Sequence, residues 1–149
     1  MEHAEIEAIL LAALNSLYAE ELKTIQIDVG ERMICGQLRG VLQQYFPDHS
    51  VHAEYNRHGL EPKGIEMPNA DGAPTTTRVF PDIIVHQPMH DDANLLVIEV
   101  KKSTNNESDS FDLAKLEQMK LQLGYRYAAF IRLSTGQKAD IANVQVTWV

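Results

Sequence analysis

Two acidic residues and a lysine near the middle of the chain have the types and the spacing to form an ion pair or to hold a divalent cation. Asp82 lies in an apolar run over residues 79–87, and Glu99 and Lys101 lie in a second apolar run over residues 95–102. The polar segment between the runs predicts a β-hairpin with a longish loop. In a hairpin centred on that loop, the numbers of facing residues sum to about 181, so we expect Asp82 opposite Glu99.

Two facing carboxylates need a cation between them. Like charges directly opposite each other destabilise a sheet, and a carboxylate in an apolar strand is costly unless it is paired or holds a metal. Lys101 is one candidate cation, because side chains alternate along a strand and Glu99 and Lys101 point to the same side. A divalent ion held by Asp82, Glu99 and the backbone carbonyl of Val100 is the other, since hard oxygen ligands suit Mg²⁺, Mn²⁺ or Ca²⁺. An ordinary ion pair on a surface hairpin also stays open.

At these positions the chain resembles the PD-(D/E)XK nuclease superfamily. Pro81 and Asp82 match the first half of the motif of that superfamily, and Glu99, Val100 and Lys101 match the second half. The resemblance implies a nuclease that hydrolyses phosphodiester bonds with Mg²⁺ or Mn²⁺ as cofactor. It implies Asp82 and Glu99 as metal ligands and Lys101 as the catalytic lysine that orients or activates the attacking water.

Glu31 opens the second predicted helix. An acid in the first turn of a helix commonly complements the helix dipole. The superfamily, however, often places a further glutamate on the helix before its first strand, close to the metal. The resemblance therefore implies Glu31 as a catalytic residue, and both roles stay open.

Five residues outside the motif are candidates for accessory or substrate-binding roles. Glu54 ends a predicted strand in an EYNR run that is similar to a run in some superfamily members, which implies an accessory acid. Arg57, Lys63 and Arg78 border a long predicted loop, and Lys102 follows the motif lysine on the opposite face of its strand. Such bases can contact phosphates, although scattered bases on a loop are often only solvated.

The elements that must position these residues alternate between helices and strands. The spacing of apolar residues predicts helices over 2–22, 30–45 and 110–124 and strands over 50–59, 79–87, 95–102, 125–134 and 144–148, the last at an edge. This order fits an α/β sandwich with a mixed central β-sheet and an N-terminal amphipathic helix. It is similar to the restriction-endonuclease-like αβα core of the superfamily, and the resemblance covers roughly residues 30–135.

Three local features complete the expected fold. Residues 58–77 are rich in Gly and Pro without periodicity, which predicts a long loop that contacts substrate or is partly disordered. Residues 24–30 predict a short extended link. Gly124 is expected to end the helix over 110–124 in a left-handed conformation, while Lys115 and Lys120 are expected on the outside of that helix.

Length and composition limit the fold and the compartment. With 149 residues, of which 44% are hydrophobic, the chain fits a single domain over residues 1–149. The resemblance implies that this domain is nuclease-like, with the helix in residues 1–23 outside the core motif region. No apolar run approaches the length of a membrane span, and the N-terminus is acidic where a signal peptide would be basic, which predicts a cytoplasmic protein with no membrane partner. The lone Cys35 excludes an internal disulfide and is expected to fill space in the core.

The net charge of −8 disfavours nucleic acid as a partner at first sight, because phosphate binding needs basic surface. Residues 1–31, however, carry seven acids and one lysine, a net of −6, which leaves −2 for the rest of the chain. The part that carries the motif is therefore near neutral and can present a local basic face. We expect nucleic acid as the partner, DNA rather than RNA, and leave open a homodimer or a larger complex.

The competing hypothesis is a catalytically silent domain that keeps the nuclease fold and binds nucleic acid or a protein partner. The presence of Asp82, Glu99 and Lys101 together favours the enzyme. A retired site has no need to keep two facing acids, which destabilise the sheet that holds them.

Overall fold

The computed structural model describes residues 1–53, 64–68, 72–78 and 80–149. Within these residues, five strands form one sheet and two strands form a separate hairpin. The elements in chain order are α1 (His3–Gln26), α2 (Glu31–Gln43), β1 (Ser50–Ala53), β2 (Gly64–Pro68), β3 (Pro74–Arg78), β4 (Ile83–His86), β5 (Leu96–Lys102), α3 (Ser110–Leu123), β6 (Tyr127–Leu133) and β7 (Gln145–Trp148), with short 3-10 turns over Asp91–Ala93 and Ile141–Asn143.

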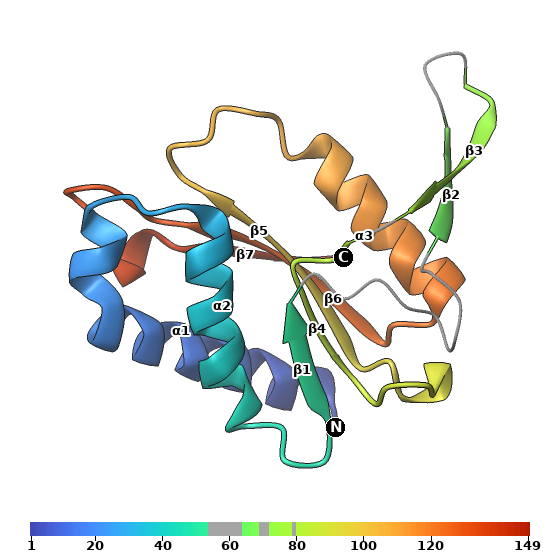
Figure 1. Cartoon of the computed structure of the whole chain (residues 1–149), viewed down its shortest axis with the longest axis horizontal. Helices are drawn as coiled ribbons and strands as arrows, with labels where there is room; N and C mark the ends of the chain where they lie inside the picture. Colours follow the sequence, from blue (N-terminus) through green and yellow to red (C-terminus); the bar gives the residue numbers. More distant parts are fainter. Residues whose placement is uncertain (54–63, 69–71, 79) are drawn as a thin grey trace.

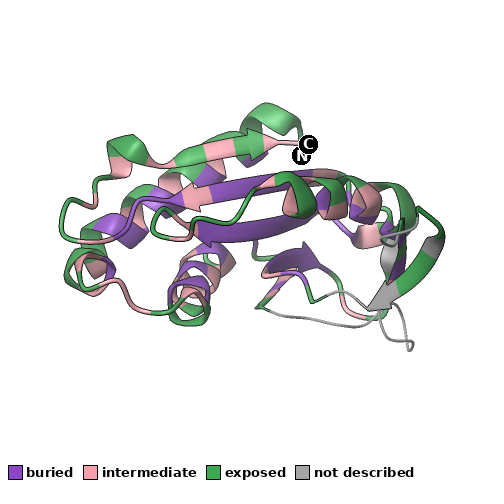
Figure 2. Ribbon diagram, turned by 90° about the horizontal axis from the view of Figure 1, so that it is seen from above, coloured by how far each residue is buried: buried purple, intermediate pink, exposed green. Residues whose placement is uncertain are grey.

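The central sheet is mixed, as predicted. Its strand order is β1-β4-β5-β6-β7, with β5 and β6 parallel and the other neighbours antiparallel. Helices α1 and α2 cover one face of the sheet and α3 covers the other (Figure 1). The α/β architecture is therefore confirmed, and β5, which carries the second half of the motif, lies in the buried middle of the layers (Figure 2).

Two apolar clusters join the layers. On the side of α1 and α2, Leu38 is buried together with Ile98 of β5. On the other side, Leu116 of α3 is buried together with Val97 of β5. Burial of one such side chain stabilises the fold by about 1.5–3 kcal/mol. Consecutive residues of β5 thus point to opposite faces, which fixes the face on which each motif residue lies.

The β4–β5 hairpin has the predicted register. Ile83 pairs with Ile98 and Ile84 pairs with Val97, so the next pair in the same register is Asp82 and Glu99. β4 begins later than the predicted run, at Ile83. The preceding Pro81 has no amide with which to extend the ladder.

Helix α1 is longer than predicted. The sequence predicted an extended link over residues 24–30, but the helix continues to Gln26. Ile25 is the reason, because it is buried in the same cluster as the apolar stripe of α1. A kink at Glu21, with φ −118° and ψ 20°, lies one turn before it. Cys35 is buried in the same cluster, as predicted.

A β-hairpin replaces part of the loop predicted over residues 58–77. β2 and β3 pair antiparallel, and Ile65 and Met67 of β2 are buried in the cluster under α3. The side chain of Gln122 on α3 accepts a hydrogen bond from the amide of Glu66 and donates one to its carbonyl, at 2.8 and 3.1 Å. Two apolar residues were too few to indicate a strand in the sequence, and the contacts with α3 supply the missing stabilisation.

Helix α3 begins and ends close to its predicted limits. It starts at Ser110 and ends at Leu123, and Gly124 has the predicted left-handed conformation, with φ 72°. Its buried residues, Leu116, Met119 and Leu123, face the sheet. Among the helices of the described residues, none has both the length and the apolar character that crossing a membrane requires.

Candidate active site

The candidate site lies where β5 continues beyond the end of β4. The ladder between these strands stops at Ile83 and Ile98, whereas β5 runs on to Lys102. On this stretch the amide of Val100 donates to Asp82 Oδ2 at 2.8 Å, and the amide of Lys102 donates to Glu31 Oε2 at 3.4 Å. Two carboxylates therefore accept hydrogen bonds from β5 amides to which backbone carbonyls of a longer β4 would bind. Both carboxylates belong to residues predicted for the site.

Strand alternation puts two motif residues of β5 on the α3 side of the sheet. Val97 of β5 and Ile84 of β4 belong to the cluster under α3. Glu99 and Lys101 therefore share that face, as predicted, while Asp82 precedes β4 and its carboxylate lies at the edge of β5. Glu99 is only 3% exposed.

The two acids are in direct contact and share their electrostatic environment. A hydrogen bond joins the side chains of Asp82 and Glu99. Burial and the nearby charge of Asp82 raise the pKa of Glu99 well above its usual value, and Lys115 only partly offsets them. Burial also raises the pKa of Asp82, although the hydrogen bond from Val100 opposes that rise. Burial is thus the largest cause of the raised pKa of both acids, and the charge of Asp82 adds to it at Glu99.

The lysine that contacts the acid pair is Lys115. Its Nζ lies 3.1 Å from Glu99 Oε1. Lys101, the candidate from the sequence, instead lies 2.7 Å from Asp112 Oδ2 and donates to the carbonyl of Ser108 at 3.0 Å. The prediction that the Lys115 side chain lies on the outer face of α3 is wrong, because Asp112 and Lys115 lie on the same side of the helix as the buried Leu116. That i, i+3, i+4 spacing was the available signal.

An arginine that the sequence did not suggest fixes the loop after β5. Arg132 of β6 donates to the carbonyls of Lys102, Asn105 and Glu107 and to the carboxylate of Asp109. Its distances to the carbonyl oxygens are 2.6, 2.5 and 2.9 Å. The carbonyl of Ser108, which holds Lys101, belongs to the same loop. Arg132 is therefore a positioning residue for the motif lysine.

We predict that Arg132→Ala lowers the free energy of unfolding by about 2 kcal/mol, because three backbone carbonyls and the Asp109 carboxylate lose a charged donor. Urea denaturation measures the change. Arg126→Ala is the matched control, since the Arg126 guanidinium contacts Glu2 at 3.9 Å and lies 5.4 Å from the centre of the Tyr127 ring, and the side chains of Arg126 and Glu2 are more than half exposed. The control is expected to change stability by less than about 0.5 kcal/mol. Equal effects of the two substitutions would remove the positioning role of Arg132.

The oxygen donors of the site fit a hard divalent cation. Asp82 and Glu99 supply carboxylates, and the carbonyl of Val100 leaves β5 at the same edge as the amide that binds Asp82. Glu99 Oε1 is buried without a hydrogen-bond partner in the part of the chain that the structure describes. Such an oxygen and a pair of acids with raised pKa values suit Mg²⁺ or Mn²⁺, which accept water or phosphate oxygens at their remaining positions. Within the described ranges, however, no group of three or more His, Cys, Asp or Glu side chains forms a metal centre.

Glu31 borders the site from α2. It lines a cavity of about 270 Å³ together with Asp82, Arg32, Cys35 and Ala53. Its charge contributes, after burial, to the raised pKa of Asp82. The structure therefore brings Glu31 beside the acid pair, where the resemblance had suggested it.

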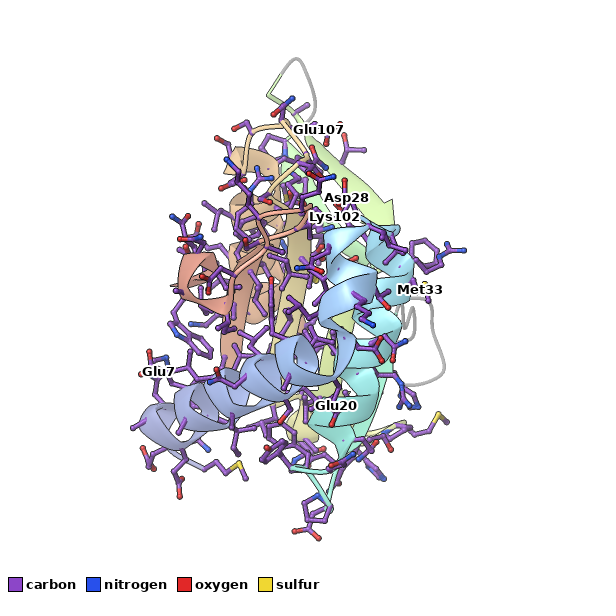
Figure 3. The ribbon with its side chains drawn as sticks, turned by 90° about the vertical axis from the view of Figure 1, so that its left-hand side faces the viewer. Glu7, Glu20, Asp28, Met33, Lys102 and Glu107 are labelled. Carbon is purple, nitrogen blue, oxygen red and sulfur yellow. The ribbon has the colours of Figure 1, made fainter. Side chains whose placement is uncertain are left out.

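Among the residues that the structure describes, none of the other residues predicted for the site belongs to this cluster. Glu54, Arg57 and Lys63 lie outside the described residues. Arg78 ends β3 opposite Gly64, and only its backbone is described. Lys102 points to the face opposite Lys101, as predicted, and its Nζ lies 3.2 Å from Asp28 Oδ1 (Figure 3).

Comparisons with protein-family models, curated proteins and solved structures find no match to this chain.

Proposed function

We propose that this protein is a divalent-metal-dependent nuclease that hydrolyses phosphodiester bonds of nucleic acid, with DNA as the expected substrate. The observation that carries the proposal is the contact between Asp82 and Glu99 at the free edge of β5. Burying two acids against each other is unfavourable. A site that keeps such a pair is best explained by a cation that the pair binds during function.

Asp82, Glu99 and the carbonyl of Val100 would hold the Mg²⁺ or Mn²⁺ ion. When bound, that ion supplies Lewis-acid chemistry, which polarises a phosphate and lowers the pKa of water. Glu31 flanks the pair and contributes to the negative potential that attracts the cation. The hydrogen bond from Val100 opposes the rise in the pKa of Asp82 and orients its carboxylate toward the edge of β5.

Lys101 has the second role in the proposal. Its ammonium is fixed on the same face as Glu99 by Asp112 and by the carbonyl of Ser108. A fixed positive charge near the acids stabilises the negative charge that develops on a phosphate under attack. Because Asp112 and Arg132 determine where Lys101 lies, they act through it and do not contact substrate in this scheme.

One observation favours the silent binding module instead. Lys101 is paired with Asp112, and Lys115 neutralises Glu99. Charges that are all compensated within the protein are typical of a structural ion-pair network. The two functions differ in whether nucleic acid is cleaved or only bound.

The decisive experiment is digestion of linear duplex DNA, circular duplex DNA and single-stranded RNA with Mn²⁺ or Mg²⁺, against the same mixtures with EDTA. We expect metal-dependent cleavage of DNA. The cleaving activity is expected to elute together with the protein in size-exclusion chromatography. Cleavage of the circular substrate would identify an endonuclease. Absence of cleavage on all three substrates, with retained binding to one of them, would replace the nuclease by the silent module.

A further inference from the structure

Lys115 occupies an unusual position for a helix lysine. It lies on α3, its side chain is 17% exposed, and its Nζ contacts Glu99 Oε1 at 3.1 Å. This single ion pair lowers the pKa of Glu99, against the larger effect of burial. The ammonium is therefore the counter-charge that the structure places on Glu99.

The second lysine on this face is held in a different way. Lys101 lies 2.7 Å from Asp112 Oδ2 and donates to the Ser108 carbonyl at 3.0 Å. Leaving that position would break a short ion pair and a hydrogen bond. Leaving Glu99 would break one ion pair of 3.1 Å, so Lys115 is the more easily displaced of the two cations.

We propose that Lys115 is the resident counter-cation of the acid pair, which a divalent metal displaces from Glu99 and whose ammonium then contacts a phosphate of the nucleic acid. This inference rests on the proposed function. It follows from competition for one oxygen, because a metal at Glu99 Oε1 and an ammonium 3.1 Å from it repel each other strongly in a buried site. The flexible four-carbon stem of a lysine permits the movement.

The experiment measures the affinity for Mn²⁺ by isothermal titration calorimetry at pH 8. Lys115→Met is expected to bind Mn²⁺ on the order of tenfold more tightly than the native protein, because a competing positive charge is removed. Lys115→Arg retains the charge and is expected to bind within about twofold of native. Lys120→Met is the control on the same helix, since Lys120 donates to the carbonyl of Val149 at 2.8 Å, away from the acid pair. A structural role alone would not tighten metal binding.

A second measurement tests the phosphate contact. The affinity for a fluorescent DNA duplex, measured by anisotropy with Ca²⁺ as the divalent ion, is expected to fall about fivefold in Lys115→Met and to change little in Lys120→Met. Unchanged or weaker Mn²⁺ binding by Lys115→Met would overturn the inference. Tighter Mn²⁺ binding with unchanged DNA affinity would overturn its phosphate half.

The two proposals fail in distinguishable ways. If Lys115→Met tightens Mn²⁺ binding but the native protein cleaves no nucleic acid, the counter-cation role stands and the nuclease function fails. If the native protein cleaves DNA and Lys115→Met leaves Mn²⁺ affinity unchanged, the nuclease stands and the counter-cation role fails.

Discussion

Replacing Lys101 by methionine is expected to lower the turnover of metal-dependent cleavage by about a hundredfold to a thousandfold while changing the KM for DNA by less than about threefold. The reason is that a fixed ammonium stabilises the charge that develops in the transition state far more than the charge already present in bound substrate. Methionine keeps most of the apolar stem of the side chain, so the substitution removes mainly the charge. Steady-state cleavage of a labelled duplex separates the two parameters.

Lys102→Met is the matched control for this prediction. It removes the same charge from the neighbouring residue, which points to the opposite face and contacts Asp28. Its turnover is expected within about threefold of native, because the side chain does not face the acid pair. Lys101→Met also leaves Asp112 and the Ser108 carbonyl without their partner, at a cost of about 1–3 kcal/mol, so assays should run well below the melting temperature. Equal turnover of the two variants would support the silent module.

Glu99→Gln is expected to stabilise the fold at neutral and higher pH, by about 1 kcal/mol or more, while abolishing the stabilisation by Mn²⁺. Burial and the charge of Asp82 raise the pKa of Glu99, so that ionising Glu99 in the folded protein is unfavourable. A glutamine has nearly the same shape and carries no charge to bury. Thermal melts of both proteins with and without millimolar Mn²⁺ measure the two effects, since a ligand that binds only the folded state raises the melting temperature.

The raised pKa of Glu99 determines how the stability of the native protein changes with pH. A carboxyl whose pKa is higher in the folded than in the unfolded protein keeps its proton longer in the folded state. Native stability is therefore expected to fall as pH rises from the ordinary value of 4.5 toward the raised folded pKa, with a slope of up to about 1.4 kcal/mol per pH unit. Glu99→Gln removes this slope, so native and variant are expected to converge near pH 4. A native protein with the same pH profile as Glu99→Gln would show that Glu99 is not buried beside a second charge.

The sequence alone determined the relations that lie within one strand or one hairpin. The register follows from a hairpin centred on the polar loop between two apolar runs, and the pair Ile83–Ile98, next to Asp82 and Glu99, agrees with it. The common face of Glu99 and Lys101, and the opposite face of Lys102, follow from the alternation of a strand. These relations involve residues close in sequence, whose geometry the backbone fixes with little help from the rest of the chain.

The sequence signal for the end of α3 was equally local. Gly124 ends α3 because a left-handed residue there satisfies the last carbonyls of the helix, and glycine adopts that conformation without strain. The limits of α1 were not determined in this way. Whether the helix stopped before or after Ile25 depended on the core into which Ile25 packs.

Only the tertiary structure decided which cation meets the acids. The sequence suggested Lys101 as the cation and placed Lys115 on the outside of α3, whereas the actual contact depended on the rotation of α3 about its own axis over the sheet. The burial of Leu116 and Met119 sets that rotation, and it brings Lys115 to Glu99 and Asp112 to Lys101. A helix orientation is the joint result of many packing contacts between distant parts of the chain, so no single spacing in the sequence specifies it.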